Sequence, residues 1–157
     1  MAGLCYEDLV PGLTIEHPIR RTVTEMDNTL FSALTYNCAP LHIDAEYAKS
    51  TIYGQRLVNS MFLLALVQGI TVIETTIGTT LGNLGFEEIK FPKPVFHGDT
   101  IHVRTTIMKS RQSKSRPETG IVTFKQEGFN QCDELVCTCV RNGLMMLRPT
   151  EGAKTNG

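Results

Sequence analysis

The sequence predicts an α+β fold in which one long buried helix is wrapped by a curved antiparallel sheet. Residues 57–73, LVNSMFLLALVQGITVI, carry no charge and are apolar on every side of a helix, which is typical of a helix inside a core. Polar residues interrupt this stretch, and its length is at the short end of the range that spans a bilayer. We therefore expect a core helix and no membrane association. Segments after residue 85 alternate with a period of two, which indicates the strands of the sheet.

Length and composition predict one soluble domain. The chain has 157 residues, of which 41% are hydrophobic and 20% charged, and it contains no repeat or linker. We assign residues 1–150 to this domain and residues 151–157 to a flexible C-terminal tail. The net charge of −1 gives no basic excess for a nucleic-acid backbone, so nucleic acid is not an expected partner.

The cysteines indicate a reducing compartment. Their number, five, is odd and their spacing is irregular, and the start MAGLCYEDLV is acidic where a signal peptide would be apolar. We expect an intracellular protein, in the cytoplasm or in the matrix of an organelle. No two pairs of Cys or His stand at metal-ligand spacing, so no metal site is expected.

The first third of the chain predicts a strand followed by short helices. Residues 13–23 are strand-like, with Pro18 suggesting an edge or a bulge. Thr24 and Asp27 form a capping-box pattern, and apolar residues at helical spacing follow it: Met26, Leu30, Phe31 and Leu34. Pro40 ends that pattern, so residues 36–43 are expected to be a loop. Asp44 is a good N-cap for a short helix over residues 45–50.

The remaining elements are the long helix and the sheet. The helix is expected over about residues 59–75, and the glycines that follow it suggest bulges: Gly78, Gly82 and Gly85. Strands are expected over residues 86–91, 100–108, 120–129 and 135–147, and residues 110–119 are expected to be a polar, basic loop.

One group of residues could carry chemistry: TYNCAPLHID, residues 35–44, together with LVNS at the start of the long helix. His42 is a candidate general acid or base because imidazole titrates near neutral pH. Asn37 can orient a water or a carbonyl. The first amides of the helix, near Ser60 and Met61, lack helical acceptors and could bind an oxyanion. The alternative is structural: His42 ties down the loop and Asn37 caps the preceding helix.

These residues resemble a known motif. The matching positions are Thr35, Asn37, Pro40-Leu41-His42, Asp44, Tyr47-Ala48, Tyr53-Gly54 and Leu57-Val58. They are similar to the hydratase motif of the MaoC-like dehydratases, relatives of the R-specific enoyl-CoA hydratases of fatty acid metabolism. Phe91-Pro92, Pro94-Val95 and Gly98-Asp99-Thr100 resemble a second family segment, and the similarity covers about residues 10–148.

The resemblance implies a hot-dog fold, in which a sheet wraps a long helix. It also implies a homodimer or a higher homo-oligomer with sites at the interface. The implied substrate is an acyl-CoA thioester, with no cofactor besides the coenzyme A of the substrate. Position by position, the family's catalytic histidine falls on His42 and its catalytic aspartate on Asn37. The glycine whose amide binds the thioester oxygen falls on Ser60. Asn37 departs from the pattern, because an amide cannot accept a proton.

The expected activity is that of a hydro-lyase, the reversible addition of water to the 2,3-double bond of a 2-enoyl-CoA. Because Asn37 removes a charge from the site, a branched or dicarboxylic substrate is the expected specialisation. The alternatives are a hot-dog thioesterase and a non-catalytic acyl-CoA-binding subunit. Three basic residues of the polar loop could bind the coenzyme A phosphates: Arg111, Lys114 and Arg116.

Overall fold

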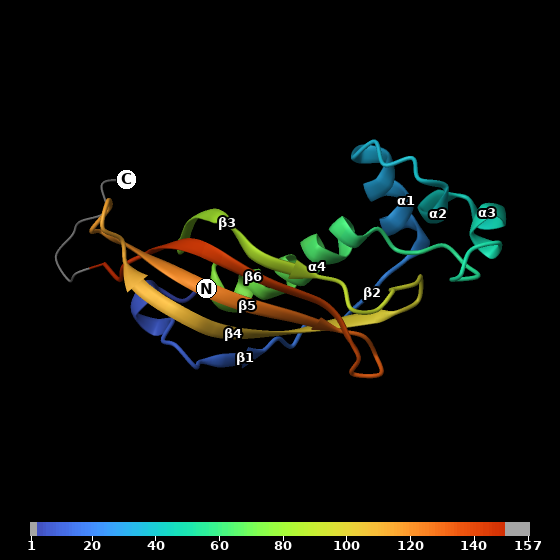
Figure 1. Cartoon of the computed structure of the whole chain (residues 1–157). Coiled ribbons are helices and arrows are strands. Elements are labelled where there is room, and N and C mark those ends of the chain that lie inside the picture. Colours follow the sequence, from blue (N-terminus) through green and yellow to red (C-terminus); the bar gives the residue numbers. More distant parts are fainter. Residues whose placement is uncertain (1–2, 150–157) are drawn as a thin grey trace.

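A computed structural model of the chain describes residues 3–149, in which one antiparallel sheet curves around a long helix (Figure 1). The strands are β1 (Thr14–Glu16), β2 (Arg21–Thr22), β3 (Thr80–Lys90), β4 (Thr100–Gln112), β5 (Thr119–Phe129) and β6 (Leu135–Met146). The helices are η1 (Tyr6–Asp8), α1 (Glu25–Leu34), α2 (Pro40–Ile43), α3 (Ala45–Lys49) and α4 (Ser60–Thr75). The tail predicted for residues 151–157 lies outside the described residues.

The sheet has the order β1-β4-β5-β6-β3, with β2 paired to β4 beyond the end of β1. The predicted alternation of β4 is confirmed, since Ile101, Val103, Thr105 and Ile107 are all buried. Register shifts accompany Gly82 and Gly85 in β3, as the glycines predicted. Three boundaries were wrong. The strand predicted over residues 13–23 is split around Pro18, and the strand predicted from residue 86 begins at Thr80. Both ends of the predicted basic loop are strand, which leaves residues 113–118 as the turn.

Helix α4 begins where predicted, because the Asn59 side chain accepts a hydrogen bond from the Met61 amide and caps the helix. One face packs on the sheet, with Leu63, Val67 and Ile70 in the core. The prediction of burial on every side was wrong. The sheet covers one flank only, and an exposed stripe follows the other at helical spacing: Met61, Ala65, Gly69, Val72 and Ile73.

The three short helices gather beyond one end of the sheet (Figure 1). The Thr24–Asp27 capping box that starts α1 is confirmed. The loop predicted for residues 36–43 is only partly a loop, because Pro40 occupies the first turn of α2, where its missing N–H costs nothing. Asp44 caps α3 as predicted. Within residues 3–149, no helix is both long enough and apolar enough to cross a bilayer.

Helix α1 is unusual in which side chains it buries. Asn28 and Ser32 are buried, whereas Met26, Leu30 and Leu34 are more than half exposed. Of the apolar residues that predicted the helix, Phe31 alone faces this chain's core, where its ring packs on Phe62. The polar face of α1 packs against the segment that carries His42.

Candidate active site

His42 lies in α2 and is anchored through its ring. Nδ1 lies 2.8 Å from the carbonyl oxygen of Leu57, just before α4. A carbonyl can only accept, so Nδ1 carries a proton, and in the neutral form of the ring Nε2 is unprotonated. No side chain or backbone group of residues 3–149 hydrogen-bonds Nε2. The arrangement is that of an oriented base.

The first turn of α4 leaves two backbone donors without an acceptor among the described residues, the amides of Ser60 and Phe62. The Met61 amide is bonded to Asn59 Oδ1 at 3.0 Å, so of the two predicted oxyanion donors this one is occupied by the cap. The Ser60 amide has no acceptor among the described residues. Ser60 lines a hollow of about 200 Å³ with Tyr53, Phe91 and Lys93. An oxyanion bound here would also lie at the positive end of the helix dipole.

Asn37 lies in the loop before α2. The backbone amide of Asn37 donates to the Ser32 carbonyl at 2.9 Å, and the side-chain Oδ1 accepts from the backbone amide of Ala39 at 3.2 Å. The backbone of Asn37 thus bonds the last turn of α1, whereas its side chain bonds the residue before α2. Asn37 also borders a largely apolar hollow of about 360 Å³, together with Cys38 and Ile43. Among the described residues, no carboxylate lines that hollow.

Two residues that the sequence analysis did not assign to the site contact its elements. Asn28 of α1 is fully buried and bonds to the backbone of both His42 and Leu57. His97 lies 3.0 Å from Asn28 Nδ2. What marks Asn28 is its burial, as a polar residue, in a helix with an apolar pattern. Burial is not visible in a sequence without the fold, so the sequence did not identify Asn28.

The charges near the site are paired. Arg56 lies 2.6 Å from Glu25. Burial lowers the pKa of His97 below its ordinary 6.5, and Arg56 lowers it further, while Glu25 opposes the shift. Arg21 holds Asp27 with two hydrogen bonds and keeps the pKa of that carboxyl well below its usual range. Among the described residues, no three metal-binding side chains gather.

The chain is similar to a known protein family over most of these elements. A model described as the MaoC-like domain matches residues 8–128, which include α1, the His42 loop, α4 and most of the sheet. The chain belongs to the MaoC-like dehydratase family. The solved MaoC-like dehydratase from Rhodospirillum rubrum is 28% identical, with a TM-score of 0.82 over 94% of this chain and 100% of that one.

Other comparisons of this MaoC-like domain agree. It is 32% identical over 149 residues to the mesaconyl-CoA hydratase of Cereibacter sphaeroides, covering 95% of this chain and 43% of that protein. The domain thus spans less than half the length of this curated relative. A conserved protein from Mycobacterium tuberculosis with a double hot-dog fold superposes with a TM-score of 0.84, at 19% identity over 94% of this chain and 45% of that one. The fold of the MaoC-like domain is the hot-dog fold, as expected.

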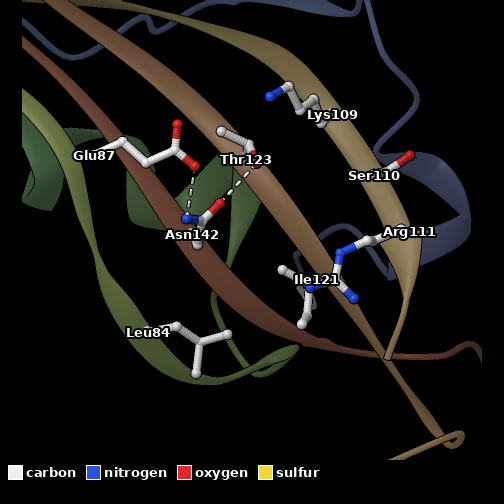
Figure 2. Close-up of a pocket in the computed structure, with 8 residues that line it drawn as sticks. All are labelled: Leu84, Glu87, Lys109, Ser110, Arg111, Ile121, Thr123 and Asn142. Atoms are coloured by element: carbon white, nitrogen blue, oxygen red, sulfur yellow. Dashed lines mark hydrogen bonds between the residues drawn. The ribbon is translucent and has the colours of Figure 1, made fainter. Parts of the chain in front are cut away.

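The residues predicted to bind coenzyme A lie at the opposite end of the MaoC-like domain from His42. Arg111 is eleven residues along β4 from Thr100, about 36 Å at 3.3 Å per residue. It lines a hollow of about 500 Å³ on the sheet with Lys109, Glu87, Thr123 and Asn142 (Figure 2). Lys114 and Arg116 lie in the turn after β4. The structure does not bring Arg111, Lys114 or Arg116 together with His42 in one chain.

Proposed function

We propose that this MaoC-like domain is a hydratase or dehydratase that adds water reversibly to the 2,3-double bond of a 2-enoyl-CoA. The observation that carries the proposal is the Leu57 carbonyl. It fixes the proton of His42 on Nδ1, and it lies three residues before the open Ser60 amide. A base and an oxyanion donor are therefore attached to the same short segment. The hydratase names of relatives support this assignment.

The reaction follows from these two groups. His42 Nε2 takes a proton from a water as the water oxygen bonds to C3, and the electron pair of the double bond moves onto the thioester oxygen. The Ser60 amide stabilises the resulting enolate, and one such donor contributes about 3 kcal/mol. The His42 imidazolium then delivers its proton to C2, which completes the addition of one water. Asn37 positions the water or the substrate and takes no proton.

A thioesterase is the less favoured alternative. It would need a carboxylate near the thioester carbon, and α4 offers Glu74 alone. Glu74 is fourteen residues from Ser60, about 21 Å along the helix, and it bonds to His17 at 2.8 Å. A binding subunit without activity is the other alternative, and it predicts affinity for acyl-CoA with no turnover.

We further propose that the acyl group of the substrate carries a free carboxylate, as that of mesaconyl-CoA does. An aspartate at position 37 would repel such a group, because charges in a dry pocket are weakly screened. Asn37 removes this repulsion and keeps hydrogen-bonding capacity, and none of the described residues that line the hollow beside it is acidic. The relative from Cereibacter sphaeroides is named for this substrate, which supports the proposal.

We also propose that the working unit is a homodimer. In the described chain, α4 carries an exposed stripe and β3 is an outermost strand of the sheet. On β3, Leu81, Leu84 and Phe86 are all at least 40% exposed, and the strand pairs only with β6 in the described chain. Exposed apolar surface and an open strand edge favour association, and a second copy would cover both symmetrically.

The experiment compares crotonyl-CoA with mesaconyl-CoA, following both the absorbance of the 2,3-double bond and the release of free thiol. Hydratase activity predicts loss of absorbance without thiol release, whereas thioesterase activity predicts the reverse. In Asn37→Asp, turnover of mesaconyl-CoA should fall and turnover of crotonyl-CoA should rise. A wild type that hydrates crotonyl-CoA better than any carboxylated analogue contradicts the substrate proposal. Binding without any turnover supports the binding-subunit alternative.

A further inference from the structure

The side chain of Asn28 has a role that neither the motif nor the relatives assign. It is 0% exposed in the second turn of α1. A buried primary amide must find acceptors for its two N–H groups and a donor for its oxygen, since an unmade hydrogen bond in a core is costly. All the partners of Asn28 belong to segments around the candidate site.

The orientation of the amide is fixed by one contact. Asn28 Oδ1 lies 2.8 Å from the backbone nitrogen of Asn59, which can only donate, so the oxygen and nitrogen of the amide cannot be exchanged. Nδ2 therefore points the other way, where it lies 3.0 Å from the His42 carbonyl oxygen and 3.1 Å from that of Leu57. The Leu57 oxygen is the atom that accepts from the His42 ring.

His97 provides the third acceptor for Nδ2, with its Nε2 at 3.0 Å. Because Nδ2 donates, Nε2 must be unprotonated, and His97 must be neutral with its proton on Nδ1. The lowered pKa of His97 agrees with this state. Two N–H groups thus serve three acceptors, so at least one hydrogen is shared.

On the basis of the proposed function, we infer that Asn28 is a positioning residue that holds the His42 base and the oxyanion end of α4 as one unit. One side chain fixes the His42 backbone, the carbonyl that orients the His42 ring, and the amide adjacent to Ser60. A shift of about 1 Å between these groups costs about a hundredfold in rate in well-oriented sites. Asn28 does not itself contact the reacting atoms.

Two variants test this role. Asn28→Ala removes every contact. Asn28→Asp keeps the acceptor for the Asn59 amide but turns a carboxylate oxygen toward two carbonyl oxygens. Each should lower kcat by about tenfold to a hundredfold, with KM changed by less than about threefold, because the lost interaction orients the base and does not bind substrate.

The matched control is Thr105→Val, which removes a different buried hydrogen bond, the one to His17 Nε2 at 2.8 Å. It lies on β4 beside the far end of α4. Thr105→Val should lower the melting temperature and leave kcat unchanged. A loss of kcat in this control equal to that of Asn28→Ala would assign the effect to general destabilisation and would overturn the inference.

A second measurement does not depend on turnover. In the wild type, ¹⁵N NMR of the His42 ring should show the tautomer protonated at Nδ1. In both Asn28 variants it should move toward a mixture of tautomers. Unchanged His42 signals with kcat within twofold of wild type would refute the inference, as would variants that are unfolded at the assay temperature. A wild type without hydratase activity, whose His42 tautomer still changes in the variants, would refute the proposed function and retain the positioning role.

Discussion

At the scale of single residues, His42 is held by its ring in a way that supports the proposed acid–base role. His17 bonds through both ring nitrogens, to Glu74 and Thr105, and His102 pairs with Asp133 and stacks on Phe129. His42 uses Nδ1 alone. Its free Nε2, next to the start of α4, is the feature that favours a role in proton transfer.

His42→Ala should lower the hydration rate by at least about a hundredfold, the usual contribution of a general acid or base. The fold should persist, because His42 is only half-buried and its ring makes one hydrogen bond. The measurement is kcat for the best enoyl-CoA, with circular dichroism as the test of folding. His102→Gln is the control and should retain full activity. Near-normal hydration by folded His42→Ala would remove His42 from the mechanism.

The activity should also fall in mildly acidic solution because of His97. Burial lowers the pKa of His97 below 6.5, so the folded protein binds this proton less tightly than the unfolded chain does. The stabilisation by neutral His97 is therefore complete above pH 6.5 and decreases as the pH falls from there through the lowered pKa. Protonation also places a donor against the Asn28 amide, so kcat should fall over the same range.

The measurement is kcat and melting temperature from pH 7.5 to 5. His97→Gln supplies an acceptor that does not titrate, so the acid loss should be smaller in this variant. Identical acid limbs in His97→Gln and wild type would show that another group controls them, and His42 would then be the first candidate.

At the scale of elements, the basic turn after β4 is the part of the predicted site that the fold separates from the rest. Arg111, Lys114 and Arg116 lie at the opposite end of β4 from α1 (Figure 1). We therefore expect them to contact only coenzyme A bound at the site of a neighbouring subunit. Replacing Arg111 and Lys114 with serine should raise KM for coenzyme A esters and leave kcat nearly unchanged, because phosphate contacts are made equally in ground and transition states. A pantetheine ester, which lacks these phosphates, is the control substrate. Equal KM values for the two esters in the wild type would exclude a phosphate-binding role.

Local sequence patterns predicted the helices better than they predicted which faces of the helices are buried. The Thr24–Asp27 box, the Asp44 cap and the long helix are set by interactions within a few residues, and these were confirmed. Burial depends on what packs from outside the element. The stripe on α4 and three apolar residues of α1, Met26, Leu30 and Leu34, are exposed in the single chain, although their patterns predicted a core.

The candidate site likewise contains residues that a local motif predicts and residues that only packing brings in. Two short segments, residues 35–44 and 57–60, pointed to His42, Asn37 and the start of α4, because each segment is continuous in the chain. Asn28 is 14 residues from His42 and 31 from Asn59, and its contacts arise only from packing. The separation of Arg111 from His42 likewise depends on the direction of β4, which composition does not indicate.

At the scale of the whole molecule, Gly69 distinguishes a monomer from a dimer. A Cβ added at this position meets no atom within 4 Å in the single chain, and replacing a helical glycine normally stabilises the helix by up to about 1 kcal/mol. If the α4 helices of two copies pack along the exposed stripe, Gly69→Leu must push them apart. We expect this variant to shift toward monomer in analytical ultracentrifugation and to lose activity on dilution earlier than wild type.

Met108→Gln, a change at a half-exposed residue on β4 away from the α4 stripe, is the control and should keep the wild-type oligomeric state. A Gly69→Leu protein that is more thermostable and has unchanged mass in solution would show that the α4 stripe does not form the interface.

The distribution of the five thiols makes the loop beside Asn37 accessible to a spectroscopic probe. Burial raises the pKa of Cys137 to about 12, and that of Cys139 is raised as well, so neither forms a thiolate at neutral pH. Cys5 is half-buried, whereas Cys38 and Cys132 are exposed. In a Cys132→Ser background, a maleimide fluorophore should therefore attach mainly at Cys38, on the rim of the hollow that Asn37 borders. Its emission would then follow acyl-CoA binding directly, even in variants whose turnover is too slow to measure.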